Sequence, residues 1–167
     1  MKIAIIIYSE SGRTQQAAEL IGKGIEQVEG CEYRIMNVDP QAGKPVDNDY
    51  IHQADAVIFG TPTYYANICW QLKKFIDETD ASFAGKLGAV FATANALGGG
   101  SETAMLTLIN QILVKGMLVY SGGTSLGKPN THLGVTSIKE VPMEQQEEKM
   151  VIFGTRIAQK AKELFEK

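Results

Sequence analysis

Residues 3–14 read IAIIIYSESGRT, and this stretch decides the fold that we predict. Its first part, Ile3–Tyr8, is a continuous apolar run without polar alternation, as expected of a strand that is covered on both faces of a sheet. The sequence holds four further runs of this kind, of which the first is the weakest: Tyr33–Val38, Ala56–Phe59, Ala89–Thr93 and Met117–Tyr120. The sequence therefore predicts five buried strands.

Apolar residues at helical spacing lie between and after these runs. They fall in four segments: Ala17–Val28, Ile68–Ile76, Ala104–Ile112 and Met150–Leu164. Strands that alternate with helices predict an α/β fold with one doubly wound parallel sheet, of flavodoxin-like or small Rossmann-like architecture. Because ligands of such sheets bind at the carboxyl ends of the strands, the loops after the first, third and fourth strands are the candidate binding loops.

Length and composition exclude several function classes. A chain of 167 residues is expected to form a single domain over residues 1–167. Its 16 basic and 19 acidic residues give a net charge of -3, which argues against a nucleic-acid partner. No apolar run approaches the roughly 20 residues of a membrane helix and no signal peptide is recognisable, so we expect a cytoplasmic protein without membrane insertion. Neither the two cysteines, Cys31 and Cys69, nor the two histidines, His52 and His132, have metal-ligand spacing, so no metal site is predicted.

The loop after the first strand is typical of a phosphate site. It consists of Ser9, Glu10, Ser11, Gly12, Arg13 and Thr14, directly before a helix. The start of a helix offers free N–H groups and a positive dipole end, three hydroxyls can donate hydrogen bonds, and a glycine lets the backbone curl round the phosphate oxygens. The alternative is that Ser11 or Thr14 only caps the helix. We favour the phosphate because a cap needs one hydroxyl, and neither a dinucleotide fingerprint nor a P-loop is present.

The other two loops are suited to a planar ring. The loop after the third strand contains Pro62, Thr63, Tyr64 and Tyr65, and two adjacent tyrosines offer a stacking surface. The loop after the fourth strand contains Thr93, Ala94, Asn95, Ala96, Leu97 and Gly98. Two more glycines follow, and their accessible backbone could bond the edge of a ring. Each loop alone has an ordinary explanation, exposed tyrosines in one case and a flexible connection capped by Ser101 in the other, but the three loops together match flavin mononucleotide (FMN) in size and polarity.

These motifs also carry a family resemblance. The pattern Ser9-x-Ser11-Gly12-x-Thr14 resembles the phosphate loop of flavodoxin-like FMN proteins. Four stretches resemble the tryptophan-repressor-binding-protein type of NAD(P)H:quinone oxidoreductase: Gly60–Asn67, Phe75–Asp77, Gly99–Thr103 and Gly116-Met117. The resemblance implies a three-layer sandwich whose five-stranded parallel sheet has the order 2-1-3-4-5. It also implies that Ser9–Thr14 hold the phosphate, that Pro62–Tyr65 lie beside the isoalloxazine, and that Thr93–Gly98 follow its pyrimidine edge.

The sequence departs from that family pattern at three places. Asp80–Gly85 is short where those oxidoreductases carry an insertion used in tetramer contacts, so we expect a homodimer, with a tetramer as the alternative. Lys115 stands at the position that matches their ring-side histidine. Ala94–Leu97 holds no aromatic residue, unlike the corresponding loop of flavodoxins, so one face of the ring is expected to stay open.

Two functions follow from the resemblance. The first is an FMN-dependent oxidoreductase that takes electrons from NAD(P)H and passes them to a quinone or similar small acceptor by a ping-pong, two-electron mechanism, without a catalytic side chain. The second is a flavodoxin-type electron carrier. A small net charge, the absence of glycine from Thr61–Asn67 and an open ring face favour the enzyme. A domain that has lost FMN and serves as an interaction module is a third possibility, which the intact hydroxyl set of the first loop argues against.

Overall fold

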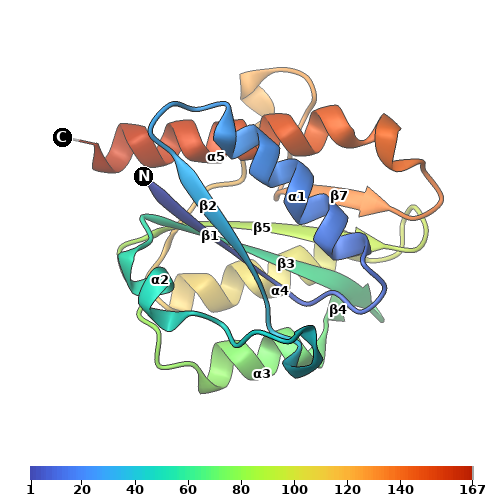
Figure 1. The fold of residues 1–167 in the computed structure, drawn as a ribbon. Coiled ribbons are helices and arrows are strands. Elements are labelled where there is room, and N and C mark those ends of the chain that lie inside the picture. Colours follow the sequence, from blue (N-terminus) through green and yellow to red (C-terminus); the bar gives the residue numbers. More distant parts are fainter. Residues whose placement is uncertain (167) are drawn as a thin grey trace.

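The computed structural model describes residues 1–166 and shows a central sheet between two layers of helices (Figure 1). Four parallel strands pair side by side in the order β2-β1-β3-β5. Their bounds are Lys2–Ile7 for β1, Glu32–Asn37 for β2, Ala56–Tyr64 for β3 and Leu87–Ala94 for β5. The predicted α/β flavodoxin-like fold is confirmed at this level.

The fifth position of the sheet differs from the prediction, because two short strands share it. Beyond β5 lie β6 (Leu118–Val119) and β7 (Val135–Ile138), and a further strand, β4 (Asn67–Ile68), pairs antiparallel with the end of β3. The sheet thus has seven strands rather than five, and the predicted strand Met117–Tyr120 pairs only through β6.

The register of β5 shows how the fifth position is split. Leu87 is paired with Leu118, and Phe91, four residues later, is paired with Val135 instead of residue 122. Thirteen residues are therefore inserted between two halves of one strand. The inserted chain leaves the sheet after β6, forms an excursion over residues 120–134, and returns to the same edge as β7.

A buried arginine holds this excursion. Arg156 of α5 (Glu147–Phe165) is 8% exposed. Its guanidinium donates hydrogen bonds of 3.1–3.4 Å to five backbone carbonyl oxygens, those of Gly122, Gly123, Leu126, Gly127 and Pro129. A loop that leaves a sheet needs partners for its carbonyl groups, and this one side chain supplies them.

The helices form two layers, one on each face of the sheet (Figure 1). On one face α1 (Arg13–Glu26) packs along α5, and two glycines allow the close approach: a Cβ on Gly24 would lie 1.9 Å from the carbonyl oxygen of Val151, and one on Gly154 would lie 2.0 Å from that of Ile21. The other face carries α2 (Asn48–Gln53), α3 (Trp70–Glu78) and α4 (Ser101–Val114). Short 3-10 turns span Pro40–Ala42, Thr124–Leu126 and Met143–Gln145.

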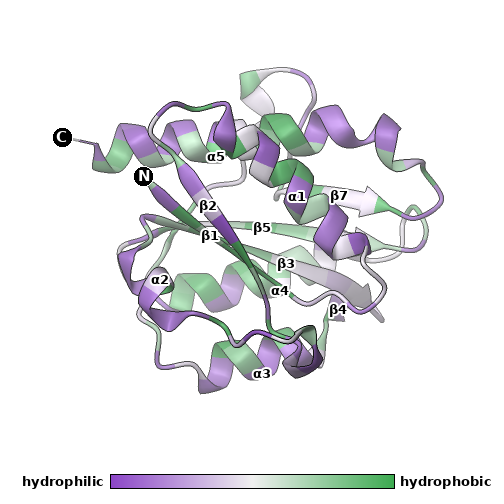
Figure 2. Ribbon diagram, viewed as in Figure 1, coloured by the Kyte–Doolittle hydropathy of each residue, from purple (hydrophilic) through white to green (hydrophobic). Residues whose placement is uncertain are grey.

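The hydropathy of the elements explains these layers (Figure 2). The central strands are apolar over most of their length, although β3 becomes polar towards its end. In β1, Ile3, Ile5 and Ile7 point to the α1–α5 face, while Ala4 and Ile6 point to the other. The helices alternate between apolar and polar positions, so each covers the sheet with one stripe. Within residues 1–166 no helix is both long and apolar enough to cross a bilayer.

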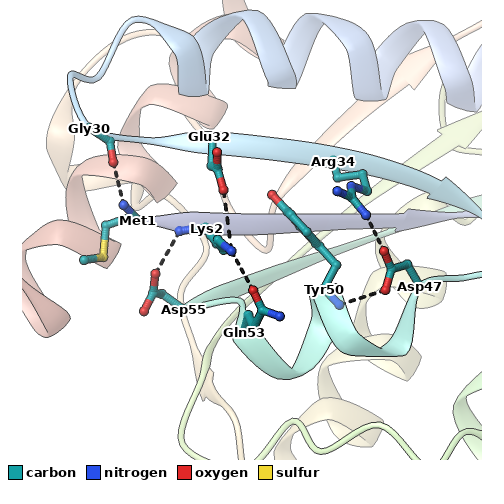
Figure 3. A network of polar contacts seen from close by, with 9 residues as sticks. All are labelled: Met1, Lys2, Gly30, Glu32, Arg34, Asp47, Tyr50, Gln53 and Asp55. Carbon is teal, nitrogen blue, oxygen red and sulfur yellow. Dashed lines mark hydrogen bonds and ion pairs between the residues drawn. The ribbon is translucent and has the colours of Figure 1, made fainter.

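Polar groups at the amino edge of the sheet bind one another (Figure 3). The backbone N–H of Lys2 donates to Oδ2 of Asp55 at 2.8 Å, and its ammonium donates to Oε1 of Gln53 at 2.6 Å. Nearby, the ammonium of Lys86 donates to the carbonyl oxygens of His52 and Ala54 at 2.9 and 2.6 Å. These bonds tie the starts of β1, β3 and β5 together, so this edge is occupied by structural contacts.

Candidate functional site

The three predicted binding loops meet at the opposite, carboxyl edge of the sheet. They surround a cavity of about 140 Å3. Ten of the sixteen predicted cofactor-binding residues line it, namely Glu10, Ser11, Arg13, Thr14, Pro62, Thr63, Tyr64, Thr93, Ala94 and Asn95. The other six, Ser9, Gly12, Tyr65, Ala96, Leu97 and Gly98, belong to the same loops without lining the cavity.

The first loop turns sharply into α1. Gly12 has a φ of 86°, a left-handed conformation that favours glycine. The hydroxyl of Ser9 accepts the N–H of Gln15, in the first turn of the helix, at 3.1 Å. Neither Ser11 nor Thr14, which the alternative interpretation took as a cap, makes such a bond. Asn37, at the end of β2, fixes Ser9 from the other side by donating to its carbonyl oxygen at 3.1 Å. The hydroxyl of Ser11 is thus left for a ligand.

A buried pair of hydroxyls joins the first loop to the third. The Oγ1 atoms of Thr14 and Thr93 are 3.0 Å apart, and both residues are almost fully buried. Two hydroxyls have two donor hydrogens and their mutual bond uses one, so one hydrogen stays free for another acceptor at the cavity.

Arg13 connects the first loop to the end of β7. Its guanidinium donates to the carbonyl oxygen of Ile138 and, at 3.1 Å, to that of Val141. Its Nε is buried without a hydrogen-bond partner among the described residues. Burial lowers the pKa of Arg13. A guanidinium nevertheless keeps its charge at neutral pH in a protein.

The second loop is a tight hairpin rather than an open loop. Pro62, Thr63 and Tyr64 belong to β3, because Pro62 is paired with Thr93 of β5 and the next two residues are paired with β4. Tyr65 and Ala66 form the turn, both with positive φ (50° and 60°), as in the two-residue turns that suit hairpin twist. The ring of Tyr65 is fully exposed.

Two side chains of this hairpin reach the cavity. The phenol of Tyr64 donates to Oε2 of Glu10 at 3.2 Å and bridges the first and second loops. Burial and the negative charge of Glu10 raise the pKa of Tyr64 to about 12, so it is a hydrogen-bond donor at neutral pH. The Oγ1 of Thr63 is buried with no partner in residues 1–166. Such an orphaned hydroxyl at a cavity is a sign of a ligand that would complete its bonds.

The third loop presses against the hairpin. Gly100 has a φ of 86°, and a Cβ placed on it would lie 2.5 Å from the Cβ of Ala66. The preceding chain projects outward, and Leu97 is 86% exposed. Within this chain, therefore, no aromatic side chain of residues 94–97 covers the space beside the hairpin.

The positions of two lysines differ from what the sequence analysis indicates. Lys139, just after β7, lines the cavity although it belongs to none of the predicted loops. Lys115 ends α4 next to β6, which pairs with the first residues of β5, so it lies at the amino edge, away from the cavity. Lys115, which the family resemblance placed beside the ring, therefore does not line the cavity of its own chain.

The residues present suit a phosphate with a ring beside it. A cavity of about 140 Å3 is below the roughly 300 Å3 of a pocket for a whole drug-sized ligand, but it has room for a phosphate. Its free donors are the hydroxyls of Ser11 and Thr63, one hydrogen of the threonine pair, the Nε of Arg13 and the ammonium of Lys139. A larger hollow of about 760 Å3 beside β2 lacks these residues, and its Arg34 already forms an ion pair with Asp47. No group of three acidic, histidine or cysteine residues suited to a metal occurs in the described part of the chain.

Comparisons with known proteins find relatives that match most of this chain. The profile of the family described as "NADPH-dependent FMN reductase" matches residues 1–129. A flavodoxin of Clostridium saccharobutylicum is 48% identical over 99% of this chain and 100% of that protein. An NAD(P)H dehydrogenase (quinone) of Geobacter sulfurreducens is 32% identical over 84% of this chain and 78% of its own. Among solved structures, a flavodoxin from the domain Archaea superposes with a TM-score of 0.77 at 26% identity, over 97% of this chain and 99% of that one.

Proposed function

Since this chain belongs to the NADPH-dependent FMN reductase family, we propose that it is an oxidoreductase that moves two electrons from NAD(P)H to a quinone or similar small acceptor. The predicted resemblance to flavodoxin-like FMN proteins is confirmed, and FMN is the cofactor that the relatives support. The finer choice of reaction is the proposal: NAD(P)H, a proton and a quinone give NAD(P)+ and a quinol.

The observation that carries the cofactor site is the set of unused donors at the carboxyl edge. In our proposal Ser11, the threonine pair and the start of α1 bind the FMN phosphate. The N–H of Gln16 bonds to Gly12 and that of Gln15 to Ser9, which leaves the N–H groups of Arg13 and Thr14 for the ligand. Pro62–Tyr65 then lie along the ring, and Thr93–Gly98 follow its polar edge. FMN, when bound, supplies the hydride-accepting ring, while the chain supplies binding and orientation.

Open space beside the hairpin supports two-electron chemistry. Tyr65 is fully exposed and Leu97 is 86% exposed, so neither side chain is packed over the place that we assign to the ring. A nicotinamide or a quinone must stack on one face of the ring to react, and this arrangement leaves a face accessible to both in turn. The ping-pong order follows from their use of one position.

A one-electron carrier is the second candidate. What favours it is the flavodoxin of Clostridium saccharobutylicum, which matches this chain over the full length of both proteins, whereas the quinone dehydrogenase of Geobacter sulfurreducens is matched over 78% of its length. The two candidates share the cofactor site and differ in what approaches the ring.

Anaerobic titration of the FMN-loaded protein with NADPH, and separately with NADH, tests the proposal. We expect the flavin absorbance to bleach fully to the two-electron level and to return when a quinone is added. If neither nicotinamide bleaches the flavin, and dithionite gives a stable half-reduced spectrum instead, the protein is a carrier. A chain that takes up no FMN would contradict both candidates.

Association into a homodimer in the cytoplasm completes the proposal. Trp70, at the start of α3, is 66% exposed, and it is the residue that we assign to the interface between copies. Size-exclusion chromatography with light scattering of wild type and Trp70→Ala measures whether this side chain contributes to association.

A further inference from the structure

We propose that Lys139 binds the phosphate group of FMN and supplies a positive charge beyond that of Arg13, which Glu10 of the same loop offsets. This inference rests on the proposed cofactor site and adds a residue from outside the three predicted loops. It concerns how the cofactor is held and not which substrate it reduces.

The charges around the cavity call for another cation. Three charged residues line it: Glu10, Arg13 and Lys139. A phosphate monoester carries a charge of about −1.5 to −2 at neutral pH. The carboxylate of Glu10 would repel the phosphate, and the Nη2 atom of Arg13 already donates to two backbone carbonyl oxygens. The ammonium of Lys139 has no hydrogen bond or ion pair with any of residues 1–166, so it alone has all of its donors unused.

The backbone of Lys139 is held firmly at the cavity. Its N–H donates to the carbonyl oxygen of Ala94 at 2.8 Å, which continues the β5–β7 pairing by one residue. Arg13 binds the carbonyl groups on both sides, at Ile138 and Val141. The buried amide of Gln146 binds the same turn, accepting the N–H of Ile138 at 2.7 Å and donating to the carbonyl oxygens of Ile138 and Val141 at 3.0 and 2.8 Å.

Arg13 therefore holds the turn from which Lys139 reaches the cavity, through the two bonds of its Nη2 atom. Arg13 of the first loop bonds to the end of β7, and Lys139, the residue after β7, lines the same cavity as the first loop. The two segments are 125 residues apart in sequence, between Arg13 and Ile138, which explains why a loop motif alone does not reveal the lysine.

Its neighbours identify the phosphate as the target. Lys139 shares one small cavity with Ser11 and Thr14, at the start of α1, where anions bind most readily. A lysine there would favour FMN over riboflavin, which has the same ring and no phosphate. A dinucleotide phosphate is the other source of the same chemistry, and the experiment separates the two.

The test is a fluorescence titration of the apoprotein with FMN and with riboflavin, for wild type, Lys139→Ala and Lys115→Ala. We expect Lys139→Ala to weaken FMN binding about tenfold, as for a charge-assisted but partly exposed contact, and to leave riboflavin binding unchanged. The salt dependence of FMN binding should flatten in the same variant. Lys115→Ala removes a lysine at the other edge of the sheet and should match wild type in all three measurements.

Several results would overturn the inference. Equal weakening of FMN and riboflavin would place Lys139 at the ring, and unchanged FMN binding would remove it from the cofactor. A rise in the KM for NADPH alone, in the loaded enzyme, would assign it to the dinucleotide. Thermal melting of the apoproteins guards against misfolding, since a side chain without partners should not alter the midpoint. If wild type binds no FMN, the proposed function itself fails, whereas failure of Lys139 alone leaves that function intact.

Discussion

The polar side chains at the two edges of the sheet differ in their hydrogen-bond partners. At the amino edge Lys2 bonds to Asp55 and Gln53 (Figure 3), and the ammonium of Lys86 bonds to the carbonyl oxygen of Ala54. At the carboxyl edge the hydroxyl of Thr63 and the Nε of Arg13 are buried without partners in the described residues. An unpaired buried polar group costs about 1–3 kcal/mol of stability, and a ligand in the cavity would compensate this cost for Thr63 and Arg13. From this comparison we propose that the amino edge stabilises the sheet and that the carboxyl edge binds the cofactor.

The largest expected effect comes from removing hydroxyls at the carboxyl edge. Ser11→Ala combined with Thr14→Ala should weaken FMN binding at least about 100-fold, because each hydroxyl would lose a hydrogen bond to a charged phosphate. Apoprotein stability should fall by only about 1 kcal/mol, for the lost bond between Thr14 and Thr93. Flavin titration and urea unfolding of the apoprotein measure the two quantities.

Thr155→Ala is the matched control for this double variant. It removes a hydroxyl of α5 that donates to the carbonyl oxygen of Gly24 at 2.9 Å, and so should lower stability without weakening FMN binding. Retention of wild-type FMN affinity by the double variant would show that the first loop does not hold the phosphate.

A smaller and opposite result is expected at the amino edge. Asp55→Ala removes the acceptor of the Lys2 N–H and should cost about 1–2 kcal/mol of unfolding free energy, with FMN affinity unchanged. Asp55→Asn keeps an acceptor oxygen and should recover most of that stability. If Asp55→Ala lowered FMN affinity as strongly as it lowers stability, the proposal that only the carboxyl edge binds the cofactor would be wrong.

The smallest effect concerns the bridge between Tyr64 and Glu10. The phenol of Tyr64 has a pKa of about 12, against about 10 in the unfolded chain. Between these two pH values the folded state retains a proton that the unfolded state loses. This contribution to stability is complete below about pH 10 and is lost as the pH rises to about 12.

Tyr64→Phe should therefore make stability less sensitive to alkaline pH, which urea unfolding midpoints at about pH 9 and about pH 11 would measure. Tyr65→Phe changes the adjacent, fully exposed ring and serves as the control. An unchanged pH profile in Tyr64→Phe would mean that the bridge does not form in solution.

The first loop and the central strands could be predicted because their signals are local. Ile3–Tyr8 is apolar throughout, and the hydroxyls and glycine of Ser9–Thr14 follow it directly. The sequence did not reveal the hairpin turn at Tyr65 and Ala66, because residues with positive φ are usually glycine or asparagine. The structure imposes this turn through the pairing of β3 with β4.

Lys139 could not be predicted because its position depends on distant contacts. Val135–Ile138 contains a threonine and a serine, and these four residues become a strand only by pairing with β5. The length of Gly122–Val141 is atypical for a plain connection and points to a function or an interface, but it does not identify the residue involved. Lys139 reaches the cavity because the side chains of Arg13 and Gln146 both bond to the carbonyl oxygen of the preceding residue, Ile138.

The split of the fifth strand has a consequence for how this chain can evolve. Because β6 and β7 keep parallel register with β5 on either side of thirteen inserted residues, the sheet accepts a change of length there without a change of pairing. A longer or shorter excursion would cost little in loop-closure entropy, which grows slowly with length. Descendants of this gene could thus gain or lose a surface segment between residues 120 and 134 and still inherit an intact binding edge.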